Sequence, residues 1–134
     1  MQDYIGKTAQ FAKTIAESDI YNFAGITGDM NPVHINEEYA KTTKFGGRIA
    51  HGMLTASFIC TVLGMYLPGV GTIHVRQELD FLRPVYIGDT VTVRLEVVAL
   101  IENKPFLKIR SQVFNQRNEL VVDGYSIVKP PKTI

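Results

Sequence analysis

The sequence predicts an α+β fold in which one bent antiparallel sheet wraps a single long helix. The helix is predicted from residue 52 to about 67, because this stretch is apolar on nearly every side and is therefore typical of a helix surrounded by protein. Four segments of alternating polar and apolar residues follow, at 72–82, 90–98, 106–115 and 120–128. They are separated by short turns, at 86–89, 102–105 and 116–119. Short turns favour hairpins and antiparallel strands, and a block of strands after helices favours α+β over a doubly wound sheet.

Smaller elements are predicted in the first part of the chain. Residues 7–15 alternate weakly and are expected to form a first strand. Ser18 is a candidate N-cap for a helix whose apolar residues recur at helical spacing, and Gly25 and Gly28 are expected to end it or form the turn beyond it. Asn36 is a candidate N-cap for a second, short helix. A single sheet has open edges, so dimerisation from edge to edge is expected.

The composition fits one domain over residues 1–134 and argues against several kinds of partner. The formal net charge is +1 and the charges are interspersed, so no clustered basic face for nucleic acid is expected. The apolar stretch 53–67 contains polar residues and is shorter than the ~20 residues of a membrane-spanning helix. The N-terminus has no signal-peptide pattern. Cys60 is the sole cysteine, which excludes an intrachain disulfide and fits a cytoplasmic location.

The most informative segment for function is 28–34, which reads GDMNPVH. Pro32 has a fixed φ and no N–H, and it disfavours helical angles at Asn31, so a helix can hardly run from Asp29 to His34. A turn is expected to present both side chains to one small volume. A carboxylate and an imidazole that share a water molecule can act as an acid–base pair. The alternative is a local Asx turn, in which Asp29 or Asn31 caps backbone N–H groups and His34 fills space.

A second candidate element, IAHGM at 49–53, begins the long helix. If the helix starts near Gly52, its first N–H groups have no intrahelical partner, and the helix dipole favours negative charge there. Gly52 lacks a side chain and lets a ligand approach the backbone closely, as an oxyanion hole requires. The alternative is that Gly52 only permits a tight turn into the helix, with His51 as its cap.

Other chemistries have less support in the sequence. His34, His51 and His74, with Asp29 or Asp80, could supply metal ligands, but their spacings are not those of recognisable metal sites, and no metal is expected. The one thiol is expected to be buried in the apolar helix and therefore inert. Neither a G-x-S-x-G element nor a glycine-rich phosphate loop is present. Single basic residues could contact a phosphorylated ligand; they are Lys44, Arg48, Arg76 and Arg83.

Three segments taken together resemble the MaoC-like hydratases, and most of all the short (R)-specific enoyl-CoA hydratases that feed polyhydroxyalkanoate synthesis. They are GDMNPVH at 28–34, IAHGML at 49–54 and FLRPVYIGD at 81–89. The resemblance covers essentially the whole chain, in order. It implies a hot-dog fold, in which the sheet wraps one central helix, and a homodimer with active sites near the interface.

The resemblance also implies roles for single residues. It places the catalytic aspartate on Asp29, the catalytic histidine on His34, and the N–H that holds the thioester carbonyl on Gly52. Asn31 is expected to shape the turn. The remaining substrate-binding candidates are Ala50, His51, Met53 and Cys60. Family members often carry a serine where this chain has Cys60, near the catalytic aspartate, and a thiol is a weaker hydrogen-bond donor than a hydroxyl.

The implied reaction is the (R)-specific, syn hydration of a trans-2-enoyl-CoA to an (R)-3-hydroxyacyl-CoA. No metal or redox cofactor is expected, because the thioester itself makes C3 electrophilic. The expected partners are the acyl-CoA and a second copy of the chain. Three alternatives stay open at this point: a 3-hydroxyacyl-acyl-carrier-protein dehydratase, an acyl-CoA thioesterase, whose usual motifs are absent, and a non-catalytic acyl-CoA-binding module.

Overall fold

The computed structural model describes residues 1–132 and has five strands, four α-helices and one 3-10 helix. The N-terminal half holds η1 (Gln2–Tyr4), β1 (Thr8–Thr14), α1 (Glu17–Thr27), α2 (Pro32–Ile35), α3 (Glu37–Ala40) and α4 (Gly52–Met65). The C-terminal half holds β2 (Ile73–Phe81), β3 (Thr90–Leu100), β4 (Leu107–Phe114) and β5 (Leu120–Lys129). Every predicted strand is present within about two residues of its expected bounds.

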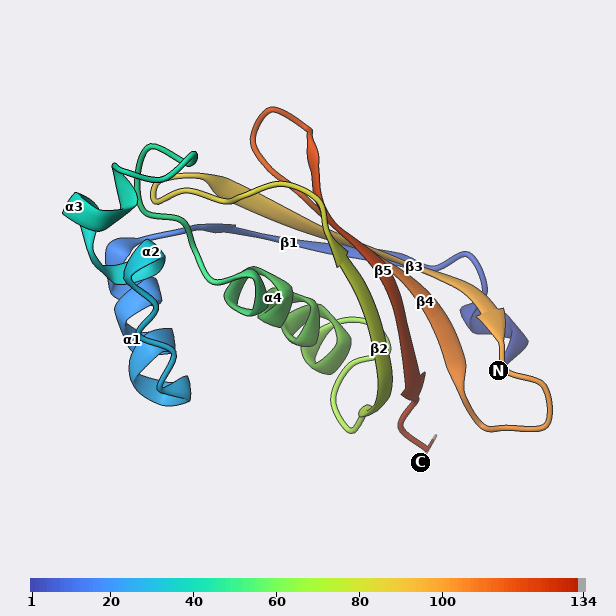
Figure 1. Ribbon diagram of the computed structural model, residues 1–134. Helices are drawn as coiled ribbons and strands as arrows, with labels where there is room; N and C mark the ends of the chain where they lie inside the picture. Colours follow the sequence, from blue (N-terminus) through green and yellow to red (C-terminus); the bar gives the residue numbers. More distant parts are fainter. Residues whose placement is uncertain (133–134) are drawn as a thin grey trace.

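The five strands form one antiparallel sheet in the order β1-β3-β4-β5-β2, and the sheet curves around α4 (Figure 1). This confirms the predicted α+β fold with a wrapped helix. One expectation is wrong. The turn at 86–89 does not close a hairpin, because β2 pairs with β5 whereas β3 pairs with β1 and β4. The chain instead crosses from one edge of the sheet toward the other, which the length of a turn does not reveal.

The core lies between α4 and the concave face of the sheet. Strand β3 alternates strictly, and its buried residues are Val91, Val93, Leu95 and Val97. Strand β4 alternates in the same way. The inward residues of α4 pack against them; they are Leu54, Ile59, Val62 and Leu63. Each fully buried side chain of this kind contributes about 1.5–3 kcal/mol. The position of α4 is therefore fixed by the sheet.

Helix α4 begins at Gly52, as predicted, and ends at Met65, two residues before the expected end. The chain then turns through a cis peptide bond between Leu67 and Pro68. Among the described residues, no helix is both long enough and apolar enough to span a membrane.

Local hydrogen bonds and one left-handed glycine set the ends of α1 and the start of α3. The backbone N–H of Ala16 donates to the Asp19 carboxylate at 2.8 Å, so α1 begins after Ala16, and the predicted N-cap Ser18 lies inside the helix. Gly28 ends α1 with a φ of 79°, which a residue with a side chain rarely adopts. Asn36 caps α3 as predicted, because its side-chain oxygen accepts from the Tyr39 N–H.

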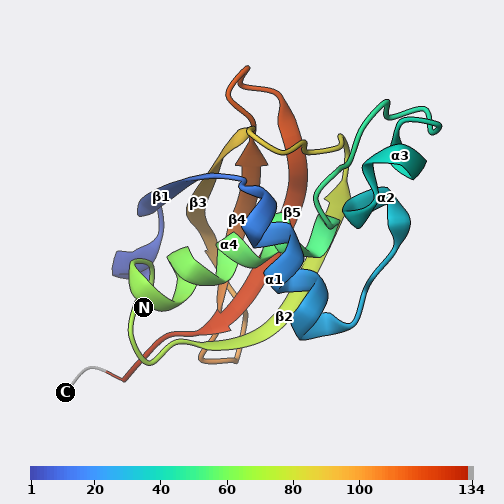
Figure 2. The ribbon, with the colours of Figure 1, turned by 90° about the vertical axis from the view of Figure 1, so that its left-hand side faces the viewer.

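The helices α1, α2 and α3 lie together at the end of the molecule where α4 begins (Figure 2). Arg48 joins α1 to α3, since its guanidinium contacts Glu17 at 2.6 Å, Glu37 at 2.9 Å and the Tyr21 hydroxyl at 2.8 Å. These carboxylates raise the pKa of Arg48, through hydrogen bonds from Glu17 first and then Glu37. Arg48 therefore anchors this helical segment, rather than a phosphorylated ligand as the sequence had allowed.

Candidate active site

Asp29 and Asn31 build the turn that the sequence predicted. The Asp29 Oδ1 atom accepts from the Asn31 N–H at 3.2 Å, and the Asn31 Oδ1 atom accepts from the Val33 N–H at 3.2 Å. Asn31 is thereby the N-cap of α2, with Pro32 at the first helical position. Both Asx turns of the local alternative are thus present. They leave Asp29 Oδ2 without a hydrogen bond from the described residues.

His34 lies on α2 and is buried. Its Nδ1 atom is 2.7 Å from the Ile49 carbonyl oxygen. Because a carbonyl can only accept, Nδ1 carries the proton, and in the neutral ring Nε2 has a free lone pair. Burial lowers the pKa of His34 below its ordinary value of 6.5, against the opposing effect of the Ile49 hydrogen bond. The lowered pKa favours the neutral ring, in the tautomer that a general base needs.

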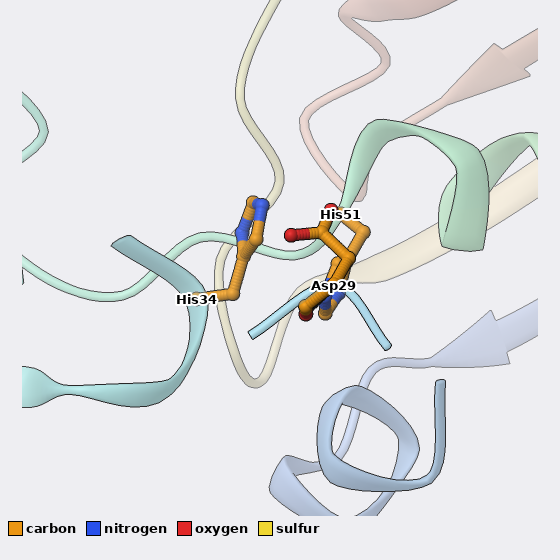
Figure 3. A group of neighbouring side chains, drawn as sticks. All are labelled: Asp29, His34 and His51. Atoms are coloured by element: carbon orange, nitrogen blue, oxygen red, sulfur yellow. Dashed lines mark hydrogen bonds between the residues drawn. The ribbon is translucent and has the colours of Figure 1, made fainter. Parts of the chain in front are cut away.

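The side chains of Asp29, His34 and His51 converge, and Figure 3 shows the Asp29 carboxylate turned toward the His34 ring. One carboxylate oxygen and one nitrogen from each ring all lie within 4.8 Å of one another. Two hydrogen bonds of roughly 2.8 Å that meet at one water molecule span roughly 4.6 Å. An Asp29 oxygen and a His34 ring nitrogen therefore lie within about the distance that one bridging water molecule spans.

His51 supports both members of this pair. Its ring stacks on His34 with a centroid distance of 4.0 Å, and it also contacts the Phe23 ring, with a centroid distance of 4.9 Å. Its Nε2 atom lies 3.0 Å from the Asp29 carbonyl oxygen and must donate to it. The buried Nδ1 atom has no partner among the described residues. The sequence suggested that His51 could cap α4, but its side chain makes no cap hydrogen bond.

Gly52 is the first residue of α4, and its N–H forms no hydrogen bond with any of the residues 1–132. The chain before it is fixed, because the Ala50 N–H donates to the Val85 carbonyl at 2.7 Å and the Ile49 N–H donates to Val33 at 3.2 Å. A Cβ atom at Gly52 would lie 2.9 Å from the Phe81 ring. Glycine is thus required for the close packing of Phe81 against the start of α4.

A pocket of about 400 Å³ opens at this point. Its walls come from α2, the start of α4 and the segment after β2, and include His34, Ala50, Gly52, Thr55, Phe81 and Val85. Lys44 and Arg83 also line it. No role for Thr55 or Phe81 was predicted from the sequence. Phe81 begins a segment that was quoted for the family resemblance, which was the only available signal.

Of the five predicted substrate-binding residues, only Ala50 lines this pocket, and the predicted catalytic residue Asp29 lies beside it rather than in its wall. The four that do not line it are Asn31, His51, Met53 and Cys60. Met53 is 58% exposed, on a side of α4 that faces away from the core. Cys60 is exposed rather than buried as expected, because it points toward β2, with its sulfur 4.0 Å from His74 Nδ1. Eight residues separate Cys60 from Gly52, or roughly 12 Å along the helix. Within one chain, Cys60 therefore contacts His74 and not Asp29.

The structure brings together only some of the residues considered as metal ligands from the sequence. His74 donates through Nε2 to Gln77 at 2.7 Å and does not join the cluster, whereas Asp29, His34 and His51 come together. Each of the two clustered histidines uses one nitrogen for a main-chain carbonyl.

Arg76, which the sequence allowed as a contact for a phosphorylated ligand, pairs with Glu78 on β2.

Comparison with known proteins identifies the family. Residues 1–117 match the family described as MaoC like domain. The chain belongs to the MaoC-like domain family. It is 51% identical over 126 residues to the (R)-specific enoyl-CoA hydratase of Rhodospirillum rubrum, covering 94% of this chain and 87% of that protein. It is 44% identical to the 3-hydroxybutyryl-CoA dehydratase of Methylorubrum extorquens, covering 96% of this chain and 81% of that protein.

Solved structures of MaoC-like proteins match the fold closely. The R-hydratase PhaJ1 from Pseudomonas aeruginosa superimposes with a TM-score of 0.91 at 43% identity, covering 96% of this chain and 83% of that chain. The (R)-hydratase from A. caviae involved in PHA biosynthesis also gives a TM-score of 0.91, at 40% identity, covering 95% and 96%. This MaoC-like chain thus has the hot-dog fold that its sequence resemblance implied.

Proposed function

We propose that this protein is an (R)-specific enoyl-CoA hydratase, which adds water to a trans-2-enoyl-CoA to give an (R)-3-hydroxyacyl-CoA. The observation that carries the proposal is the convergence of Asp29 and His34 within 4.8 Å, at a pocket that His34 and Gly52 both line. The (R) stereochemistry rests on the hydratase relatives at 40–51% identity.

In the proposed mechanism, Asp29 and His34 hold the attacking water between them. The free lone pair on His34 Nε2 takes a proton from this water while the oxygen adds to C3 of the substrate. The proton taken from the water is delivered to C2 through the same site, with Asp29 as donor or relay, so that H and OH both come from one water molecule and the Asp29–His34 pair returns to its starting protonation state. His51 holds the Asp29 main chain and stacks on His34, so it positions both groups.

The carbonyl half of the reaction is proposed to take place at the start of α4. As water adds to C3, negative charge develops on the thioester carbonyl oxygen. The unpartnered Gly52 N–H and the positive end of the helix dipole stabilise this charge. The thioester polarises C3 by itself, so the proposed reaction uses no metal or redox cofactor.

The test is the loss of enoyl absorbance from crotonyl-CoA, with chiral analysis of the product. We expect Asp29→Asn and His34→Gln each to lower kcat by about 10²–10⁴-fold, because each removes one acid–base group. Asp3→Asn, a matched change at an exposed position on η1, should leave the rate unchanged. A metal chelator should also have no effect. A near wild-type rate for either site variant contradicts the proposal.

Acyl carrier protein is the alternative carrier. The chain is 33% identical over 97% of its length to a mitochondrial 3-hydroxyacyl-[acyl-carrier-protein] dehydratase from Solanum lycopersicum. Lys44 and Arg83 line the pocket and suit the phosphate that both carriers have. Comparison of kcat/KM for crotonyl-CoA and crotonyl-acyl carrier protein separates the two. We propose CoA, because the relatives at 40% identity or more that name a carrier name CoA.

We also propose that the protein acts in the cytoplasm as a homodimer, joined at the free edge of β2. The structure from A. caviae is described as a hydratase involved in PHA biosynthesis. An (R)-3-hydroxyacyl-CoA product made by this chain would be suited to the same use.

A further inference from the structure

Two buried side-chain polar atoms have no hydrogen-bond partner among residues 1–132, and both lie at the first turn of α4. They are His51 Nδ1 and Thr55 Oγ1. Thr55 is 1% exposed, yet it is one of the residues that line the pocket next to Gly52 and His34. A buried hydroxyl without a partner lowers the stability of the fold, so its presence calls for an explanation. A ligand in the pocket would supply the missing partner.

The position of Thr55 on the helix places its side chain over the first turn of α4. Residues three apart lie on the same face of a helix, so Thr55 and Gly52 are neighbours. Helical side chains also lean toward the N-terminus of their helix. Because Gly52 has no side chain, nothing on α4 separates the Thr55 hydroxyl from a group that accepts from the Gly52 N–H.

The chemistry of an enoyl thioester limits what this hydroxyl can bind. Around the reacting carbons, the substrate is hydrocarbon except for the thioester, whose carbonyl oxygen is the only strong acceptor. We propose that the Thr55 hydroxyl is a second hydrogen-bond donor to this oxygen, beside the Gly52 N–H. Thr55 is then a catalytic residue, since it contacts the atom that gains negative charge. This inference rests on the proposed hydratase function.

A second donor has a defined energetic consequence. The carbonyl oxygen of the substrate is a modest acceptor, whereas the enolate-like oxygen of the transition state is a strong one. A donor placed here therefore binds the transition state more tightly than the substrate, which raises kcat more than it lowers KM. Removal of one oxyanion-hole donor in other enzymes costs about 10²–10³ in kcat.

The experiment compares three variants with crotonyl-CoA as substrate. Thr55→Val keeps the shape but lacks the hydroxyl, and Thr55→Ser keeps the hydroxyl. Thr61→Val makes the same change six residues further along α4, outside the pocket. We expect Thr55→Val to lose about 10²-fold in kcat with a smaller change in KM. Thr55→Ser should retain most of the activity, and Thr61→Val all of it. The melting temperature of Thr55→Val should be unchanged or higher, because the variant removes an unpaired buried hydroxyl.

Four results would overturn the inference. Thr55→Val could retain the wild-type kcat, or Thr55→Ser could fail to recover the activity, which would mean that the hydroxyl is not the active group. Thr55→Val could melt well below the wild type, which would make the role structural. Thr55→Val could raise KM for the 3-hydroxyacyl-CoA in the reverse reaction and leave kcat unchanged. This result would mean that Thr55 binds the C3 hydroxyl of the product rather than the carbonyl oxygen. Failure of the wild type to hydrate crotonyl-CoA instead contradicts the proposed function itself.

Discussion

At the scale of single residues, the protonation state of His34 has a measurable consequence. Burial lowers the pKa of this ring below 6.5, so the neutral base persists to lower pH than for an exposed histidine. We expect the acidic limb of kcat/KM for hydration to lie below pH 6.5. The measurement is a pH–rate profile with crotonyl-CoA over the range in which the fold is intact. A limb above pH 6.5 would contradict the assignment of His34 as the base.

The same lowered pKa also links His34 to stability. The unfolded chain takes up a proton near pH 6.5, whereas the folded chain resists protonation until the pH is lower. The contribution of neutral His34 to the free energy of unfolding is therefore fully present above pH 6.5. It is lost as the pH drops from 6.5 to the lowered pKa of the folded chain. His34→Gln should remove this contribution to the pH dependence, which chemical denaturation at several pH values would measure.

How far the sequence predicted the site depends on the range of each interaction. Asp29 and His34 could be identified because Pro32 interrupts the helix between them, which is a local effect. Gly52 could be identified because it precedes a long apolar run. The position of Thr55 in the pocket could not, since its burial and its missing partner depend on the segment after β2, far away in the chain.

At the scale of elements, the first turn of α4 depends on the absence of a side chain at Gly52. A Cβ atom there would lie 2.9 Å from the Phe81 ring, which is itself half-exposed and can move. We expect Gly52→Ala to displace this ring into the pocket and to lower kcat/KM strongly, with a change in unfolding free energy below about 1 kcal/mol. Thermal melting and steady-state kinetics would measure the two effects.

A second substitution tests whether the ring is the cause. Phe81→Leu in the Gly52→Ala background gives the new methyl group room, so the double variant should recover part of the activity lost in Gly52→Ala. Two independent sites would instead give additive losses. Additivity would show that Gly52 is needed for a reason other than its contact with Phe81.

The strands and helices were predictable from the periodicity of the sequence, whereas the pairing of the strands in the sheet was not. Strand β3 alternates along its length and was found, but nothing in its sequence indicates that it pairs with β1 rather than β2. The start of α1 was misjudged by two residues. Ser18 is a good N-cap in isolation, but Asp19 caps the backbone of Ala16 and starts the helix earlier.

At the scale of the whole molecule, one side of α4 and the free edge of β2 form an exposed surface. The helix contributes no charged residue to this surface. Helix α4 has no charged residue, yet Met53 and Met65 are 58% and 62% exposed. Strand β2 pairs only with β5 in the sheet, which leaves its other edge open within residues 1–132. Exposed apolar side chains beside an open strand edge are typical of an interface. This surface is the one that the proposed homodimer would bury.

Gly64 offers a test of this interface that spares the fold of one chain. It lies on α4, is partly exposed, and a Cβ atom there would meet nothing within 4 Å. Gly64→Glu should therefore fit the single chain and even favour the helix, by up to about 1 kcal/mol. In a dimer it would place an unpaired charge against the partner. We expect Gly64→Glu to sediment as a monomer in analytical ultracentrifugation, whereas the wild type sediments as a dimer.

Gly25→Glu is the matched control, because Gly25 is an equally open glycine within α1, and this variant should remain dimeric. A dimeric Gly64→Glu protein would place the interface elsewhere.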